Sequence, residues 1–171
     1  MTDQSRSEFE AVSFGKRVAN SQTFTVLFKE GMALVEETAS YLDGPGRRES
    51  KALDRNGALA YATESMRLTT RLMQIASWLL LHRAVNEGEM SLAQANTEKR
   101  KVKLSAGDQA DAEILGMLPE DLRQLIGRSL GLQERVRRLD LAIHSEPGGG
   151  EGENPVERQL GVLRAAFERD R

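Results

Sequence analysis

Apolar positions recur every three or four residues between residues 21 and 42. This spacing places them on one face of a helix about 33 Å long, because an α-helix rises 1.5 Å per residue. Ser21 is suited to the N-cap, and the run Asp43-Gly44-Pro45-Gly46 is expected to end the helix. The positions on the predicted face are Phe24, Leu27, Phe28, Gly31, Leu34, Val35, Thr38, Tyr41 and Leu42.

A second helix, predicted over about residues 56–86, carries two neighbouring rows of heptad-spaced positions. One row contains Ala62, Met66, Thr69, Met73, Ala76 and Leu80. The other contains Tyr61, Ser65, Leu68, Leu72, Ile75 and Leu79. Two adjacent rows make a face too broad for one partner helix, and Trp78 and Leu81 widen it further. We therefore expect this helix to lie at the centre of a bundle and to be shared between the subunits of a dimer.

A third helix is predicted over residues 112–144, where the same three-and-four spacing continues and Pro119 suits a restart of the helix. The segment 89–110 is polar and is expected to be a loop or a frayed extension of a helix. No segment shows the strict alternation of a half-buried strand. The sequence thus predicts an all-α fold, a dimeric three-helix bundle over residues 21–144, preceded by a flexible N-terminal arm at residues 1–20.

The composition changes after residue 144. Residues 145–155 are rich in glycine and proline and are expected to form a flexible linker within a disordered tail, 145–171. Beyond the linker, apolar residues with a 4-3-4 spacing predict a short docking helix at 156–169 that folds on contact with a partner. These candidate partner-binding residues are Val156, Leu160, Leu163 and Phe167. The alternatives are that the segment packs back on the bundle or has no role.

Composition excludes several kinds of chemistry. The 171 residues include 24 Lys and Arg against 26 Asp and Glu, a net charge of −2 that argues against a dedicated nucleic-acid binder. The chain has no cysteine, so disulfides and thiol chemistry are absent. Neither His82 nor His144 belongs to a Glu-x-x-His pair, and both are expected to be capping or surface residues. We predict no catalytic, cofactor-binding or metal-binding residue, and no cofactor.

The sequence shows neither an export signal nor a membrane-spanning segment. The first 13 residues contain four charges and no long apolar run, which is not the pattern of an export signal. The longest apolar block, residues 75–81, is far shorter than the roughly 20 residues that span a bilayer. A cytoplasmic location without membrane insertion is expected.

Two segments suggest alternative functions. Residues 44–48, Gly-Pro-Gly-Arg-Arg, contain glycines and cations as phosphate-binding loops do, but they match neither standard motif and follow a helix. Residues 127–138 resemble a helix-turn-helix with Gly131 as the turn, although the heptad spacing runs through that glycine. A DNA-binding regulator therefore remains an alternative, as does a helical dimer that senses a small molecule between its helices.

Three charged residues of the second helix, Glu64, Arg67 and Arg71, are separated by three and four positions. This spacing allows a Glu64–Arg67 ion pair and contacts with a neighbouring helix. Such a group forms either a charged recognition patch or salt bridges at the rim of the core, and the second interpretation is favoured.

The segment from Tyr61 to Leu80 resembles the signature of an alphaproteobacterial family of helical adaptors, the regulators of CtrA degradation (RcdA), once a domain of unknown function. Shorter runs match the same family at the same relative places: Phe28-Lys29-Glu30-Gly31-Met32, Glu36-Glu37, Tyr41-Leu42-Asp43-Gly44 and Arg83-Ala84-Val85. The resemblance covers roughly residues 9–145. It marks as scaffold or interface residues Tyr41, Asp43, Glu64, Arg67, Arg71 and Trp78.

The resemblance implies a dimeric three-helix bundle without catalytic activity. Its expected role is that of an adaptor in cell-cycle-regulated proteolysis by ClpXP. Expected partners are the ClpX unfoldase primed by a CpdR-type response regulator, cargo proteins, and a PopA-type c-di-GMP-responsive adaptor that delivers CtrA. The family also implies recruitment to the cell pole. No nucleic acid is expected among the partners.

Overall fold

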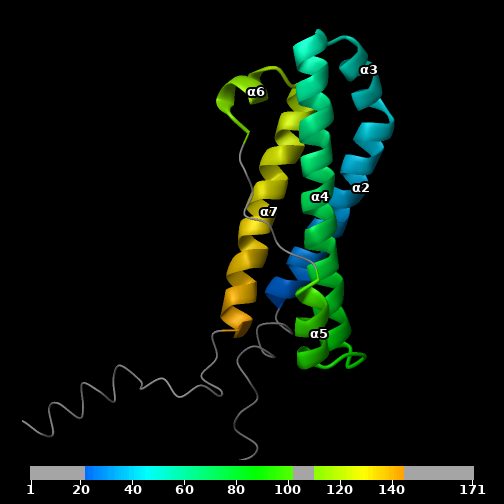
Figure 1. Ribbon diagram of the computed structural model, residues 1–171. Coiled ribbons are helices and arrows are strands. Elements are labelled where there is room, and N and C mark those ends of the chain that lie inside the picture. The colour runs from blue at the N-terminus through cyan, green and yellow to red at the C-terminus, as the bar shows by residue number, and fades with distance from the viewer. Residues whose placement is uncertain (1–21, 102–109, 145–171) are drawn as a thin grey trace, which may run out of the picture.

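The computed structural model describes residues 22–101 and 110–144, and the described residues contain helices and no strand. Three long helices, α2 (Gln22–Asp43), α4 (Arg55–Asn86) and α7 (Glu120–His144), form the body of the molecule (Figure 1). Three short helices connect them: α3 (Pro45–Lys51), α5 (Leu92–Lys99) and α6 (Ala112–Gly116). The predicted all-α fold class is confirmed. The predicted N-terminal arm and C-terminal tail lie outside the described residues.

The direction of the long helices determines the connections. In Figure 1, α2 runs antiparallel to α4 and α7, whereas α4 and α7 run parallel. Two parallel helices need a connection that runs back along their whole length, because the end of the first helix and the start of the second lie at opposite ends of the bundle. Residues 87–119 make this return, with α5 beside the C-terminal end of α4 and α6 at the opposite end of the bundle (Figure 1).

This connection differs from the expected polar loop at 89–110, because part of it is the helix α5. Ser91 starts α5 with a capping box: its hydroxyl accepts from the Gln94 N–H at 3.1 Å, and its own N–H donates to the Gln94 side chain at 2.9 Å. Ala95 of α5 is buried. Leu92 of α5 packs against the core, but this short helix has too few apolar residues to show a clear period.

The predicted third helix at 112–144 is two helices. α6 ends at Gly116 and α7 begins at Glu120, immediately after Pro119. Proline has no N–H to continue the hydrogen bonding of a preceding helix, but its fixed φ suits the start of a new one. The break allows α6 to turn away from the axis of α7 at the end of the bundle (Figure 1).

The ends of α4 are closed by local hydrogen bonds. Asp54 caps the N-terminus, accepting from the Gly57 N–H at 2.7 Å. At the C-terminus, the N–H groups of Gly88 and Glu89 donate to the carbonyls of Val85 and Ala84 at 3.1 and 2.9 Å, which is a Schellman motif. Gly88 has the positive φ of 75° that this motif requires and that glycine adopts without strain.

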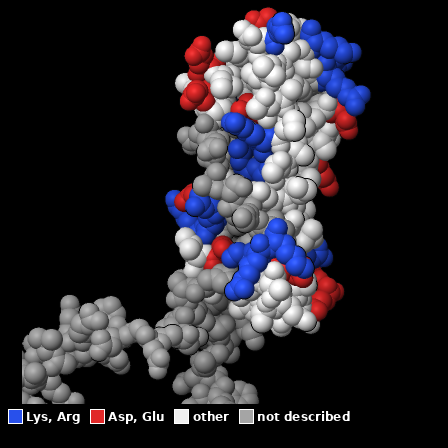
Figure 2. Space-filling view, viewed as in Figure 1, with Lys and Arg blue, Asp and Glu red and all other residues white. Residues whose placement is uncertain are grey.

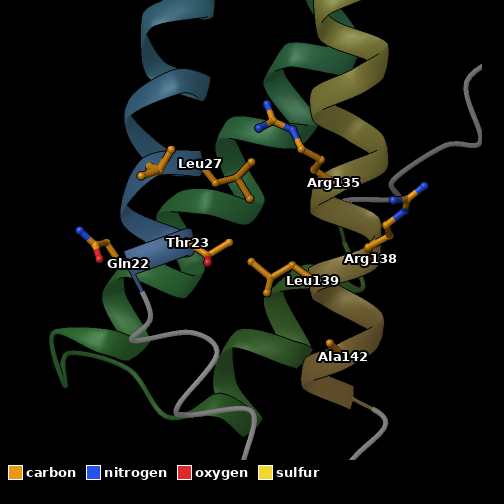
Figure 3. A pocket seen from close by; sticks show the side chains of 8 residues that line it. Gln22, Thr23, Leu27, Arg135, Arg138, Leu139 and Ala142 are labelled. Carbon is orange, nitrogen blue, oxygen red and sulfur yellow. The ribbon is translucent and has the colours of Figure 1, made fainter.

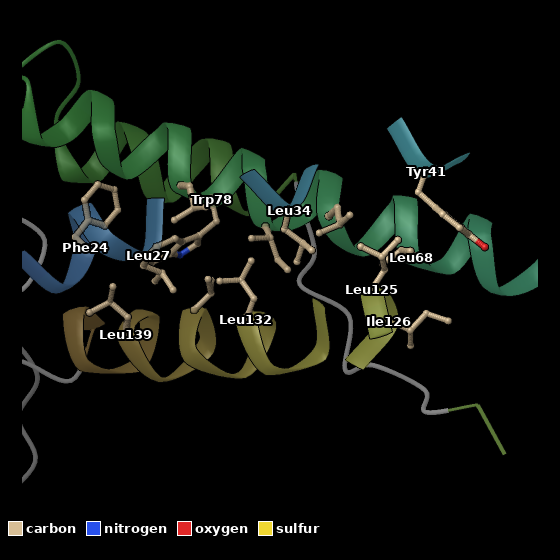
Figure 4. Close-up of a cluster of buried hydrophobic side chains, with 14 of the residues drawn as sticks. Phe24, Leu27, Leu34, Tyr41, Leu68, Trp78, Leu125, Ile126, Leu132 and Leu139 are labelled. Atoms are coloured by element: carbon tan, nitrogen blue, oxygen red, sulfur yellow. The ribbon is translucent and has the colours of Figure 1, made fainter. Parts of the chain in front are cut away.

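The core lies between the three long helices, where one heptad row of α4 packs against α2 and α7 (Figure 4). A close approach of α2 and α4 occurs at Gly31, where a Cβ atom would lie 2.5 Å from Leu79 Cδ1. The most completely buried apolar side chains, each less than 2 % exposed, are Leu34, Leu68, Ile75, Leu79, Leu122, Leu132 and Val136.

Candidate protein-interaction surface

The surface of α4 carries large apolar side chains spaced seven residues apart. Leu59, Met66, Met73 and Leu80 are 68, 71, 63 and 52 % exposed. With the smaller residues between them they form the open row, defined as Leu59, Ala62, Met66, Thr69, Met73, Ala76 and Leu80. Figure 2 shows a stretch of uncharged surface along α4, between groups of charged side chains.

The two rows predicted for this helix thus differ in burial. Leu68, Leu72, Ile75 and Leu79 of one row are at most 4 % exposed, whereas the large side chains of the open row face outwards. Full burial of a leucine or methionine side chain stabilises a contact by about 1.5–3 kcal/mol. A heptad-spaced apolar row is the surface that a second helix packs against. The geometry therefore favours a protein-binding surface along α4.

Two charged side chains, Glu64 and Arg71, are buried on the inner side of the same helix, whereas Arg67 is exposed. Glu64 is buried and its Oε1 lies 3.3 Å from Nη1 of Arg67, which is the ion pair that the spacing allowed. Arg71 is only 6 % exposed, and its Nη1 donates to the Ser129 hydroxyl at 2.7 Å. Ser129 in turn donates to the Ile126 carbonyl at 2.7 Å. Burial lowers the pKa of Arg71, and the charge of Glu64 opposes this shift.

Arg71 therefore joins α4 to α7 in the interior instead of forming an exposed recognition patch. Its partner Ser129 is 58 positions away in the sequence. Spacing within one helix gives no information about such a contact.

Trp78 connects four helices. Its Nε1 donates to Asp140 Oδ1 of α7 at 2.8 Å, and Asp140 also accepts from Lys99 Nζ of α5 at 2.6 and 2.5 Å. The Trp78 ring lies 6.3 Å from that of Phe24 on α2 and 4.1 Å from that of His82. This cluster fixes α5 and the end of α7 against α4.

The expectation that His82 is a capping or surface residue is wrong. Its side chain is 2 % exposed and packs against Trp78. The neighbouring turn of α4 is apolar nearly all round, so an imidazole at this position lies inside the bundle. The side chain of His144 lies outside what the structure describes.

The remaining family-signature residues lie near the turn between α2 and α3. Tyr41 is buried, and its hydroxyl donates to Glu49 Oε2 at 2.6 Å. Burial raises the pKa of Tyr41, and the hydrogen bond and charge of Glu49 raise it further. Asp43 is exposed and lies 3.3 Å from Arg47. Of the six signature residues, only Asp43 and Arg67 are exposed.

The segments proposed for nucleotide or DNA binding have other structures. Residues 45–48 form the first turn of α3, with Gly46 buried. α7 is continuous through Gly131, so residues 127–138 do not form a helix-turn-helix. Arg128 of this segment lies 2.7 Å from Glu37, and Arg135 is paired with Glu30. Pairing with carboxylates reduces the positive field that attracts phosphates.

Three further observations concern the described part of the chain. It contains no group of three or more side chains of His, Asp or Glu placed to hold a metal ion. None of the helices described is both long and apolar enough to cross a membrane. Two of its hollows, one between α2 and α7 and another lined by α2 and the end of α4, are open at the surface.

These features define the class of protein: an all-α scaffold with a heptad-spaced apolar row on its surface. Residues 15–167 match the family model described as "Protein of unknown function (DUF1465)". The crystal structure of RcdA from Caulobacter crescentus CB15 is similar, with 53% sequence identity and a TM-score of 0.63. The match covers 77% of this chain and 98% of that chain. A comparison with curated proteins finds no match.

The chain belongs to the RcdA family, which confirms the resemblance found in the sequence. The name RcdA denotes a regulator of CtrA degradation.

Proposed function

We propose that this chain is a non-enzymatic adaptor that assists cell-cycle-regulated proteolysis by ClpXP. The observation that carries the proposal is the 53% identity to RcdA over nearly the whole of that chain. The adaptor tethers cargo, or a PopA-type adaptor that delivers CtrA, to ClpX primed by a CpdR-type response regulator. It acts in the cytoplasm and is recruited to the cell pole.

We also propose that the chain is a homodimer, and the open row supports this proposal. Two copies of α4 that pack along this row bury apolar side chains from Leu59 to Leu80, a length of about 32 Å at 1.5 Å per residue. The row is uncharged, so its self-contact requires no buried charge. A dimer presents two copies of every other contact, which raises the effective concentration of bound cargo.

The tail supplies the proposed partner contact. Val156, Leu160, Leu163 and Phe167 lie outside the described residues, and their role is a hypothesis drawn from their spacing. A second weak contact on the same scaffold increases delivery about 100-fold without new chemistry.

The test is degradation of CtrA by purified ClpXP with the response regulator and the PopA-type adaptor, with and without this chain. We expect degradation to be faster with the chain. The triple variant Leu160→Ser, Leu163→Ser and Phe167→Ser should lose most of this gain. The matched control, Arg158→Gln with Arg169→Gln, changes the opposite face of the same segment and should keep it.

Two results would contradict the proposal in different ways. Degradation at the same rate with and without the chain would reject the adaptor function. Full stimulation by the triple variant would retain that function but remove the tail from it.

A further inference from the structure

Ion pairs close the outer edge of the contact between α2 and α7 at regular intervals. Glu37 pairs with Arg128, and Glu30 pairs with Arg135. Each step moves seven residues back along α2 and seven residues forward along α7, as antiparallel helices require. We call this series the ion-pair ladder.

The next step of the ladder falls on Thr23 and Ala142, which are short and uncharged. At this place the structure has an open groove of about 650 Å³ (Figure 3). Its floor includes the buried side chains of Leu27 and Leu139, and Val26, 56 % exposed, also lines it. The groove thus lies where a third ion pair of the ladder would fall.

Two arginine side chains border this apolar floor on the α7 side. Arg135 and Arg138 line the groove together with the apolar side chains (Figure 3). The exposed fractions of their side chains are 47 and 76 %. Arg135 is paired with Glu30 and Arg138 with Glu134, so the groove favours an occupant mainly through its apolar floor.

A segment of this chain carries an apolar face, and the backbone leaves the bundle beside the groove. α7 ends at His144, two residues after Ala142. The linker 145–155 contains Glu146, Glu151 and Glu153 and no basic residue. Eleven residues of this kind span about 18 Å on average, so the following segment starts within reach of the groove.

Residues 156–167 carry four apolar side chains on one helical face, over about 18 Å of helix. We propose that this segment docks as a helix in the α2/α7 groove of its own chain, with Leu160 and Leu163 against Val26 and Leu139. The short linker gives an effective concentration on the order of 1 mM, so a weak contact is sufficient.

This contact is independent of whether the chain acts as an adaptor. If it does, the same four side chains cannot bind the groove and a partner at once. A partner that binds the tail must therefore displace it from the groove, and the strength of the groove contact limits partner binding.

The absence of cysteine from the sequence allows a direct test by disulfide cross-linking of the full chain. One variant carries Val26→Cys and Leu163→Cys. The matched control carries Ala52→Cys and Leu163→Cys, because Ala52 is also exposed but lies at the end of α3, away from the groove and outside the open row. Disulfide formation is followed by mass under non-reducing conditions.

We expect an intramolecular disulfide to form at least about tenfold faster in the first variant than in the control. Equal rates in the two variants would overturn the proposal. A disulfide found only between two chains would also overturn it and would assign the groove to the tail of a second copy.

Hydrogen exchange gives a readout without engineered cysteines. The triple variant Leu160→Ser, Leu163→Ser and Phe167→Ser should increase exchange in the first turns of α2, whereas Arg158→Gln with Arg169→Gln should not. Unchanged exchange in the triple variant would contradict docking in this groove.

Discussion

The two heptad rows of α4 differ in burial although they share a spacing. Leu79 is fully buried against α2 and α7, and the adjacent Leu80 is 52 % exposed. The direction of each row relative to α2 and α7 decides which becomes the core. Heptad spacing of apolar residues therefore identifies a surface that packs against a partner. It does not show whether that partner belongs to the same chain or to another.

The largest expected effect is a difference between the two rows in how much a substitution lowers the free energy of unfolding. Leu79→Ala should lower the free energy of unfolding by about 3 kcal/mol, because it leaves a cavity in a closely packed core. Leu80→Ala should change it by less than about 0.5 kcal/mol. Urea denaturation at a concentration that keeps the chain monomeric measures both. Equal losses would contradict the division of α4 into a core row and an open row.

A smaller effect tests how the inner side of α4 is fixed to its neighbours. Trp78→Phe keeps an aromatic ring but removes the hydrogen bond to Asp140, and should destabilise the fold by about 1–2 kcal/mol. Lys99→Met, which removes the other partner of Asp140, should give a loss of similar size. The same urea titration measures these values, and a neutral Trp78→Phe would show that the indole contributes only by packing.

The pH dependence of Tyr41 gives a third test. Burial and Glu49 raise the pKa of Tyr41 above its ordinary value near 10, so the folded state keeps the phenol protonated where the unfolded state loses its proton. Stability from this residue is therefore fully present below about pH 10 and falls as the pH rises further. Thermal unfolding between pH 9 and 11 should show a smaller decrease for Tyr41→Phe than for the unchanged chain.

The smallest expected effect concerns the ion-pair ladder. Thr23→Glu with Ala142→Arg supplies the missing third pair and should stabilise the bundle by less than about 1 kcal/mol, as exposed ion pairs do. The same substitutions fill the α2/α7 groove and should release the tail. Thermal unfolding measures the first effect, and the cross-linking assay measures the second. A reversed pair, Thr23→Arg with Ala142→Glu, controls for side-chain volume.

Much of the fold followed from local patterns, whereas the contacts between helices did not. The three-and-four spacing predicted an all-α fold and placed long helices where the structure has α2 and α4. It gave no means of identifying Ser129 as the partner of Arg71, or Asp140 as the partner of Trp78, because these pairs are 58 and 62 residues apart.

The candidate surface was predicted only in part. The row containing Met66, Met73 and Leu80 was recognised, but Leu59 was missed, although it lies seven residues before Met66. Which row faces outwards depends on how α2 and α7 pack, and that is a property of the whole bundle. The groove beside Thr23 and Ala142 depends on the register between two helices, and these two residues are more than 100 positions apart in the sequence.

Self-association tests the central claim, that the open row of α4 is a partner surface, most directly. Sedimentation equilibrium should show a dimer for the unchanged chain and a monomer, over the same concentration range, for Met66→Lys with Met73→Lys. Leu141→Lys, which changes a leucine on α7 that is 68 % exposed, should remain dimeric. A dimer of unchanged affinity in the Met66 and Met73 variant would contradict the account.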